Sequence, residues 1–199
     1  MTSLDPRRTA IVLIDLQKGI LARPTVPHAT ADLLDRTQQL LGAGRAAGLL
    51  VIHVRVGWSD DMGDSPSAPV DQPGPSRASP PPSGFADSVE GFGPAPGELL
   101  ITKRQWGAFQ GTELDLQLRR RGIDTIILSG VASDIGVEST ARFGWELGYA
   151  QIVVEDATAG YDEDQHRSSF AKIFPRIARV RSTEQVVSMI NSFQQQDQP

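Results

Sequence analysis

The stretch GIDTIILSGVASDIGVESTAR, residues 122–142, contains the features that decide the fold. Its apolar run, residues 125–128, is short and lacks the alternation of polar and apolar residues typical of a half-exposed strand. It therefore predicts a strand covered on both faces, as in a parallel sheet. Gly130 and Gly136 bracket the turn that follows, and a helix is expected from about residue 134 to residue 147. Free N–H groups at the start of that helix could bind an anion.

Similar apolar runs lie on both sides of this stretch, separated by longer amphipathic segments. The expected strands are residues 10–14, 49–54, 99–102, 125–128, 151–154 and 177–180. The other expected helices are residues 30–47, 112–122, 162–174 and 183–193. This alternation predicts parallel strands joined by right-handed helical crossovers. The expected fold is α/β: a doubly wound, six-stranded, mainly parallel sheet with helices on both faces, in a Rossmann-like three-layer arrangement.

Length and charge limit the function classes. The chain has 199 residues, with 19 Lys and Arg against 24 Asp and Glu, and a net charge of −5. This length suits one domain, residues 1–199. The acidic balance, without a long basic run, argues against a nucleic-acid or membrane surface. We therefore expect a small-molecule substrate as the partner.

The chain contains no cysteine. Disulfides, thiolate metal sites, iron–sulfur clusters and thiol nucleophiles are thereby excluded. The first apolar stretch, residues 10–16, is too short for a signal-peptide core or a membrane span. We expect a cytoplasmic protein.

A long segment, residues 57–97, interrupts the alternation of strands and helices. It holds nine of the chain's 14 prolines. Proline continues neither a helix nor a sheet ladder, so the segment is expected to be a loop. Long loops in compact domains tend to be functional lids or disordered linkers, and no independent core lies beyond this one that a linker would join. We interpret it as a lid whose Trp58 could close on a substrate.

Polar side chains follow the expected strands at the end where ligands bind in doubly wound sheets. Asp15 and Lys103 each end an apolar run. A carboxylate and an ammonium at the ends of neighbouring strands can face each other in one cleft, where the lysine would tune the proton affinity of the carboxylate. Taken alone, Asp15 could instead be a structural cap and Lys103 a solvated lysine.

Several linked segments in order, IVLIDLQ (11–17), the long run 103–142 and VVEDATAG (153–160), resemble the isochorismatase-like hydrolases, also called the cysteine hydrolase superfamily. The resemblance implies a six-stranded parallel sheet and a catalytic Asp, Lys and Cys. Asp15, Lys103 and Gly136 occupy the matching positions. It also implies an oxyanion hole from the backbone N–H groups of Ala132 and Gly136, a cis peptide bond between Val131 and Ala132, and a homodimer or homotetramer.

Gly136 stands where the related amidohydrolases have their thiol, so the thioester route is closed to this chain. Isochorismatases also lack that cysteine, and in them the Asp is thought to protonate a vinyl ether carbon. This chain reads Ala132-Ser133-Asp134 at a turn where isochorismatases have a Tyr-Ala-His type of sequence. It looks like a cysteine-free branch that differs from both classes.

Three hypotheses stay open. The first is vinyl-ether hydrolysis of a small anionic metabolite, with Asp15 as general acid and no cofactor. The second is water-mediated amide hydrolysis, with Asp15 as general base. The third is an inactive ligand-binding or scaffold protein.

The remaining candidates concern substrate binding and metals. The expected pocket walls are Gln17, Arg55, Arg104, Trp106 and Phe109. The three histidines, His28, His53 and His166, are scattered along the sequence. The Asp/His cluster with which nicotinamidases hold a metal has no counterpart after the second strand. No metal site and no cofactor are therefore predicted.

Overall fold

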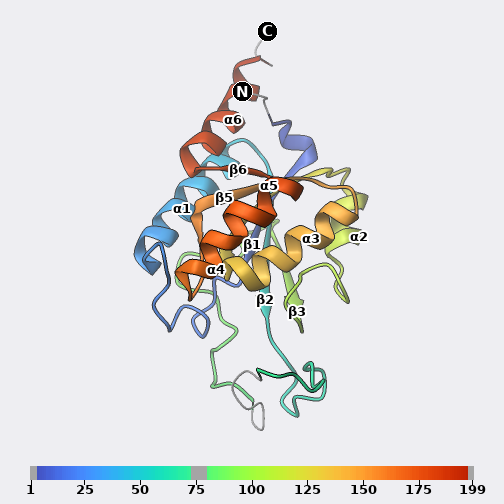
Figure 1. Cartoon of the computed structure of the whole chain (residues 1–199). Helices are drawn as coiled ribbons and strands as arrows, with labels where there is room; N and C mark the ends of the chain where they lie inside the picture. Colours follow the sequence, from blue (N-terminus) through green and yellow to red (C-terminus); the bar gives the residue numbers. More distant parts are fainter. Residues whose placement is uncertain (1–3, 73–79, 197–199) are drawn as a thin grey trace.

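A computed structural model describes residues 4–72 and 80–196 of the chain (Figure 1). Its sheet has six strands in the order β3-β2-β1-β4-β5-β6, and every neighbouring pair is parallel. The predicted doubly wound α/β fold is thus confirmed. The strands are β1 Thr9–Ile14, β2 Leu50–Val56, β3 Leu99–Lys103, β4 Thr125–Val131, β5 Ala150–Ala159 and β6 Arg179–Arg181.

Helices cover both faces of the sheet (Figure 1). On one face α1 and α6 pack with Ile11 and Leu13 of β1. On the other face α2, α3 and α5 pack with Val12 and Ile14. Successive residues of β1 therefore enter two different cores, which explains why the strand is apolar without alternation. The helices are α1 Thr30–Ala46, α2 Leu114–Arg120, α3 Glu138–Glu146, α4 Glu163–Ser168, α5 Phe174–Ile177 and α6 Thr183–Gln196.

Two expected helices are divided by π-helical turns. The helix expected at 134–147 begins with the π-helical turn Ser133–Val137 and continues as α3. The helix expected at 162–174 breaks into α4, the turn Ser169–Ile173 and α5. Pro175 lies in the first turn of α5, because its missing N–H and fixed φ are tolerated there and not in a helix interior.

Several strands end at other residues than the sequence predicts. The strands β4 and β5 run on to Val131 and Ala159, beyond the predicted ends at 128 and 154. Within β5 the pairing with β4 is irregular: Leu128 pairs with Val153, but Gly130 pairs with Thr158. Two steps along β4 thus correspond to five along β5, so β5 bulges between these pairs. Such bulges re-aim side chains.

The loop between β2 and β3 contains the predicted lid. The part of that prediction at residues 73–79 lies outside the described residues. The section of this loop at residues 85–89 is held to the loop after β1 by three backbone hydrogen bonds. They run from Lys18 N to Asp87 O (2.9 Å), from Gly19 N to Phe85 O (3.1 Å) and from Val89 N to Leu16 O (3.0 Å).

Two peptide bonds, Val26–Pro27 and Val131–Ala132, are cis. In the described part of the chain, no helix has the length and apolar character required to cross a membrane.

Candidate active site

Asp15 lies directly after β1 at the carboxyl edge of the sheet. Its backbone has φ +54°, an uncommon conformation for a residue other than glycine. Its N–H donates to the carbonyl of Val54 on the neighbouring strand β2 (2.9 Å). The backbone thus turns sharply here while staying bonded to the sheet, which fixes where the carboxylate lies.

Lys103, at the end of β3, forms an ion pair with Asp15, with 2.8 Å between Nζ and Oδ2. Both side chains are almost fully buried. The Lys103 ammonium also donates to the carbonyl of Trp106 (2.5 Å). The expectation that the pair comes from neighbouring strands is wrong, because β2 lies between β1 and β3. The long lysine side chain reaches across that gap.

Burial determines the protonation of Asp15. Removal of the carboxyl group from water, partly opposed by the Lys103 ammonium, raises the pKa of Asp15 from its ordinary value of 3.8 to about 6. The oxygen Oδ2 contacts Lys103, whereas Oδ1 is buried without a hydrogen-bond partner. Asp15 can therefore hold or release a proton near neutral pH, and one of its oxygens is available for that exchange.

Gly136 lies beside this ion pair. A Cβ on Gly136 would lie 3.2 Å from Asp15 Oδ2, 3.2 Å from Lys103 Nζ and 3.0 Å from Ile14 Cγ2. The three positions that match the catalytic residues of the resembled family thus meet at one point.

A cavity of about 190 Å³ opens above Asp15, Lys103 and Gly136. Of the predicted wall and oxyanion-hole residues, Arg104, Trp106, Ala132 and Gly136 line it. Trp58 and Pro66 of the lid loop also line it, and the Trp58 indole N–H donates to the carbonyl of Arg104 (2.7 Å). The other wall residues are Ile20, Val56, Gln105, Val131, Ile135 and Tyr161.

Three predicted wall residues do not line this cavity. The buried Gln17 amide donates to Val56 O (2.9 Å) and accepts from Val56 N (2.7 Å), so it joins the loop after β1 to the end of β2. The Arg55 guanidinium donates to Thr102 Oγ1 (3.0 Å) because side chains alternate along β2 and Val56 takes the cavity side. Phe109 is buried and stacks on Tyr149, with ring centroids 5.6 Å apart. In this structure these three residues are therefore not walls of this cavity.

Tyr161 and Ile20 are wall residues that the sequence analysis missed. The Tyr161 hydroxyl donates to the carbonyl of Ile20 (2.7 Å), so the two close one side of the cavity together. The signal for Tyr161 was its place just after a strand, but the expected strand ended at residue 154 and hid it.

Arg104 brings positive charge to the cavity wall. Its Nε donates to the carboxylate of Asp64 (2.5 Å), while Nη1 is buried without a hydrogen-bond partner. A buried guanidinium N–H without a partner is costly, and an anionic group would satisfy it.

Comparison with known proteins identifies the class. The family model described as the Isochorismatase domain matches residues 9–185. The chain therefore belongs to the isochorismatase family.

Three relatives illustrate its range. The uncharacterized isochorismatase family protein YecD of Escherichia coli O157:H7 is 45% identical over 190 residues, which cover 96% of this chain and 100% of YecD. The ureidoacrylate amidohydrolase RutB of Caulobacter vibrioides is 31% identical and covers 84% of each chain. A solved isochorismatase family protein from Burkholderia thailandensis has a TM-score of 0.89 at 38% identity, covering 96% of this chain and 99% of that one.

Two of the three histidines, which are scattered along the sequence, come together in space. His53 is buried and contacts Glu98 (2.8 Å), away from the cavity. His28 and His166 both lie close to Glu155, and His166 also contacts Ser133.

Proposed function

We propose that this protein is a hydrolase of a small anionic metabolite and that it cleaves a vinyl ether with Asp15 as general acid. The observation that carries the proposal is the buried Asp15–Lys103 ion pair below the cavity. A carboxyl group with a pKa near 6 is still partly protonated at neutral pH, as a general acid must be.

The proposed reaction has two proton steps. The proton on Asp15 adds to the terminal carbon of the vinyl ether, using the electron pair of the double bond, and leaves an oxocarbenium ion. Water adds to that cation and returns a proton to the carboxylate, and the hemiketal then collapses to a ketone and an alcohol. Between the steps Asp15 is an anion, which the Lys103 ammonium stabilises at 2.8 Å.

The absence of a side chain at Gly136 suits a water nucleophile. The point that a Cβ would occupy lies only 3.2 Å from both Asp15 Oδ2 and Lys103 Nζ, so a side chain there would crowd the ion pair. Without that side chain, water in the cavity, which Gly136 lines, can approach the ion pair. We therefore assign this chain to a cysteine-free branch of the family, in which water replaces the thiol as the nucleophile. The backbone N–H groups of Ala132 and Gly136, the expected oxyanion hole, are proposed to bind an anionic group that the substrate carries, since this route develops positive charge at the reacting carbon.

Cavity size and chemistry support a small anionic substrate. A volume of about 190 Å³ admits only a small molecule. Trp58, Trp106 and Tyr161 offer apolar faces for its body. The buried Nη1 of Arg104 would bind its carboxylate or another anionic group. We further propose that the chain acts as a single domain, with residues 57–97 as its lid, and assembles as a homodimer or homotetramer.

Water-mediated amide hydrolysis is the second candidate. It is favoured by the similarity to proteins named ureidoacrylate amidohydrolase. In that reaction ionised Asp15 would accept a proton from water, so the two candidates require opposite protonation states of the same carboxyl group.

The test measures turnover by the purified chain on two kinds of substrate. The first is isochorismate, with the release of pyruvate as the readout, and the second is a panel of small ureido and carboxamide acids. We expect Asp15→Asn to lower turnover about 10²–10⁴-fold while circular dichroism stays unchanged. Asp124→Asn, at an exposed ion pair with Arg8, is the matched control and should keep full activity. Absence of turnover on both kinds of substrate, or full activity of a folded Asp15→Asn variant, would overturn the proposal and favour a ligand-binding role.

A further inference from the structure

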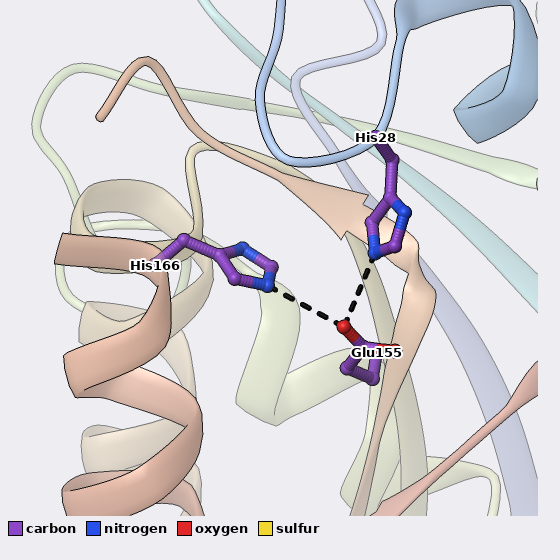
Figure 2. Close-up of side chains that lie close together, drawn as sticks. All are labelled: His28, Glu155 and His166. Carbon is purple, nitrogen blue, oxygen red and sulfur yellow. Dashed lines mark hydrogen bonds and ion pairs between the residues drawn. The ribbon is translucent and has the colours of Figure 1, made fainter. Parts of the chain in front are cut away.

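His28, Glu155 and His166 form a cluster outside the cavity (Figure 2). The Nε2 atom of His28 lies 3.2 Å from Glu155 Oε1, and the Nε2 atom of His166 lies 3.6 Å from the same oxygen. All three atoms lie within 4.8 Å of one another. Within residues 4–72 and 80–196 this is the one group of three or more such side chains that converges in this way.

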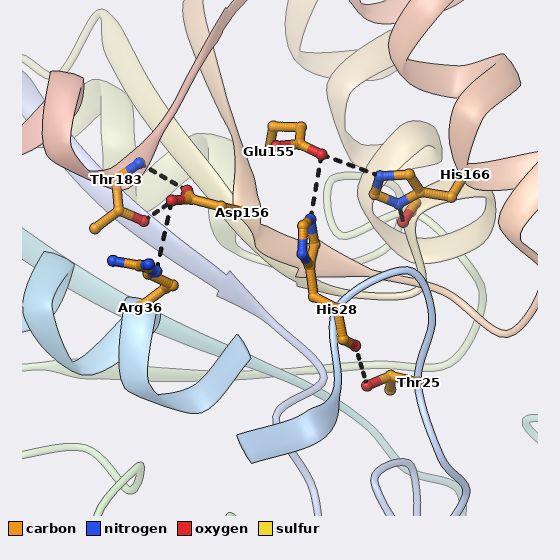
Figure 3. A network of polar contacts seen from close by, with 8 residues as sticks. Thr25, His28, Arg36, Glu155, Asp156, His166 and Thr183 are labelled. Atoms are coloured by element: carbon orange, nitrogen blue, oxygen red, sulfur yellow. Dashed lines mark hydrogen bonds and ion pairs between the residues drawn. The ribbon is translucent and has the colours of Figure 1, made fainter. Parts of the chain in front are cut away.

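Three separate elements hold these side chains in place. The bulged strand β5 sends Glu155 toward the histidines and the next residue, Asp156, toward Thr183 at the start of α6 (Figure 3). His28 follows a backbone pairing of Val26 with Gly160, with N–O distances of 3.0 and 2.8 Å.

His166, on α4, is held at both sides of its ring. It stacks on Phe170, with ring centroids 4.5 Å apart. Its Nδ1 lies 2.7 Å from the hydroxyl of Ser133. The imidazole is thus oriented so that Nε2 faces Glu155, with a hydrogen-bonding partner on the other nitrogen, as is usual for a histidine that binds a metal.

We propose that His28 Nε2, His166 Nε2 and Glu155 Oε1 bind a divalent transition-metal ion of the zinc class. Two imidazole nitrogens and one carboxylate oxygen are a ligand set that Zn²⁺ and its neighbours favour. Tetrahedral coordination with bonds of about 2.0–2.1 Å separates ligand atoms by roughly 3.3 Å. The two distances to Glu155 bracket that value, so a small movement of the two rings brings the three atoms into range.

The remaining coordination position would be supplied from a neighbouring cavity. This cavity, of about 380 Å³, adjoins the cluster and is lined by Pro27, Glu155, Glu163, His166, Arg167, Phe170 and Ala171. Water or a small ligand can reach an ion from there. The one cation on this wall, Arg167, pairs with Glu163 and Asp164 at 3.0 Å each, which offsets its repulsion of a metal.

Such an ion would act on the active site through one residue. Ser133 contacts His166 and directly follows Ala132, which lines the catalytic cavity. The metal would therefore brace the turn that carries the proposed oxyanion hole. His28, Glu155 and His166 are positioning residues in this arrangement.

A network of hydrogen bonds without any ion is the competing explanation. In that network Ser133 donates to His166, and both Nε2–H groups donate to Glu155. The substitution Glu155→Gln separates the two explanations, because a glutamine oxygen still accepts both hydrogen bonds but lacks the negative charge that makes a carboxylate the stronger ligand for a divalent cation.

The experiment titrates the full chain, without a histidine tag and after treatment with a chelator, with Zn²⁺ by calorimetry. We expect one equivalent to bind to the wild type, and Glu155→Gln and His28→Gln to weaken binding about tenfold or more. His53→Gln is the matched control. His53 also contacts a carboxylate, that of Glu98, but the third group there is Arg45 rather than a histidine. It should bind Zn²⁺ like the wild type.

Co²⁺ added to the wild type supplies a readout that needs no variant, since its visible absorption reports a tetrahedral site with nitrogen ligands. Absence of saturable binding and of this spectrum would overturn the proposal. Wild-type affinity in a folded Glu155→Gln variant would do the same.

Discussion

The dependence of activity on pH tests the assignment of Asp15, and Lys103→Met is the perturbation that makes the test specific. Methionine keeps an unbranched side chain of similar length but removes the ammonium 2.8 Å from the Asp15 carboxylate. That ammonium favours the ionised form, so its loss should raise the pKa of Asp15 above its value of about 6 in the wild type. Loss of an adjacent opposite charge shifts a carboxyl pKa by about 1–3 units.

Whether kcat/KM rises or falls with pH follows from the protonation state of Asp15 that each reaction requires. A general acid is active while protonated, so kcat/KM on a vinyl ether should fall as the pH rises above about 6. Between pH 6 and pH 8 the protonated fraction drops from about one half to about one hundredth, so activity should drop roughly 50-fold. In Lys103→Met the falling limb should move to higher pH by about 1–3 units, with a lower maximum rate.

The assay is kcat/KM measured across the range in which both variants stay folded. Amide hydrolysis with Asp15 as general base would instead give a rate that rises with pH through about 6. A falling limb that does not move in Lys103→Met would refute the reasoning, because the titrating group would then not be the partner of Lys103.

Three further predictions concern other parts of the chain. Thiol reagents should leave the wild type unchanged, whereas the thiol of Gly136→Cys should be alkylated with a pKa below the ordinary value of about 8.5. Lys103 Nζ and the start of the following helix stabilise its thiolate, and we expect them to outweigh the Asp15 carboxylate at the same 3.2 Å; a pKa at or above the ordinary value would contradict this. Gln17→Leu should lower the free energy of unfolding in denaturant by about 2 kcal/mol or more, because the buried N–H and C=O of Val56 lose their amide partner; an unchanged unfolding midpoint would count against it. Limited proteolysis should cleave first within residues 57–97, whose described part forms no helix or extended strand, and early cleavage within residues 125–148 would contradict the assignment of the lid.

The sequence predicted the strands well because their signal is local. Residues 125–128 are apolar on both faces, and this pattern needs no knowledge of distant residues. Asp15 and Lys103 were predicted because both follow such runs and because both match family motifs. The sheet order could not be read from spacing, so the position of the predicted strand β2 between them was missed.

The differences between the expected and the observed site arise from the directions of side chains and from contacts between residues that are distant in the sequence. Arg55 and Val56 are neighbours in the sequence, but strand geometry sends them to opposite faces, and only Val56 reaches the cavity. Gln17 was expected to bind substrate, yet its amide is used by the backbone of Val56. His28 and His166 are 138 residues apart, and the bulge in β5 that brings Glu155 to both has no sequence signal of its own.

The division of β1 between two cores has a consequence for changes in chain length. Ile11 and Leu13 enter one core, and Val12 and Ile14 enter the other. An inserted or deleted residue within β1 would exchange these two sets and turn Asp15 away from Lys103 in the same step. The segment between β2 and β3 does not alternate between two cores in this way. Homologous chains should therefore differ in length there, while β1 keeps a constant number of residues.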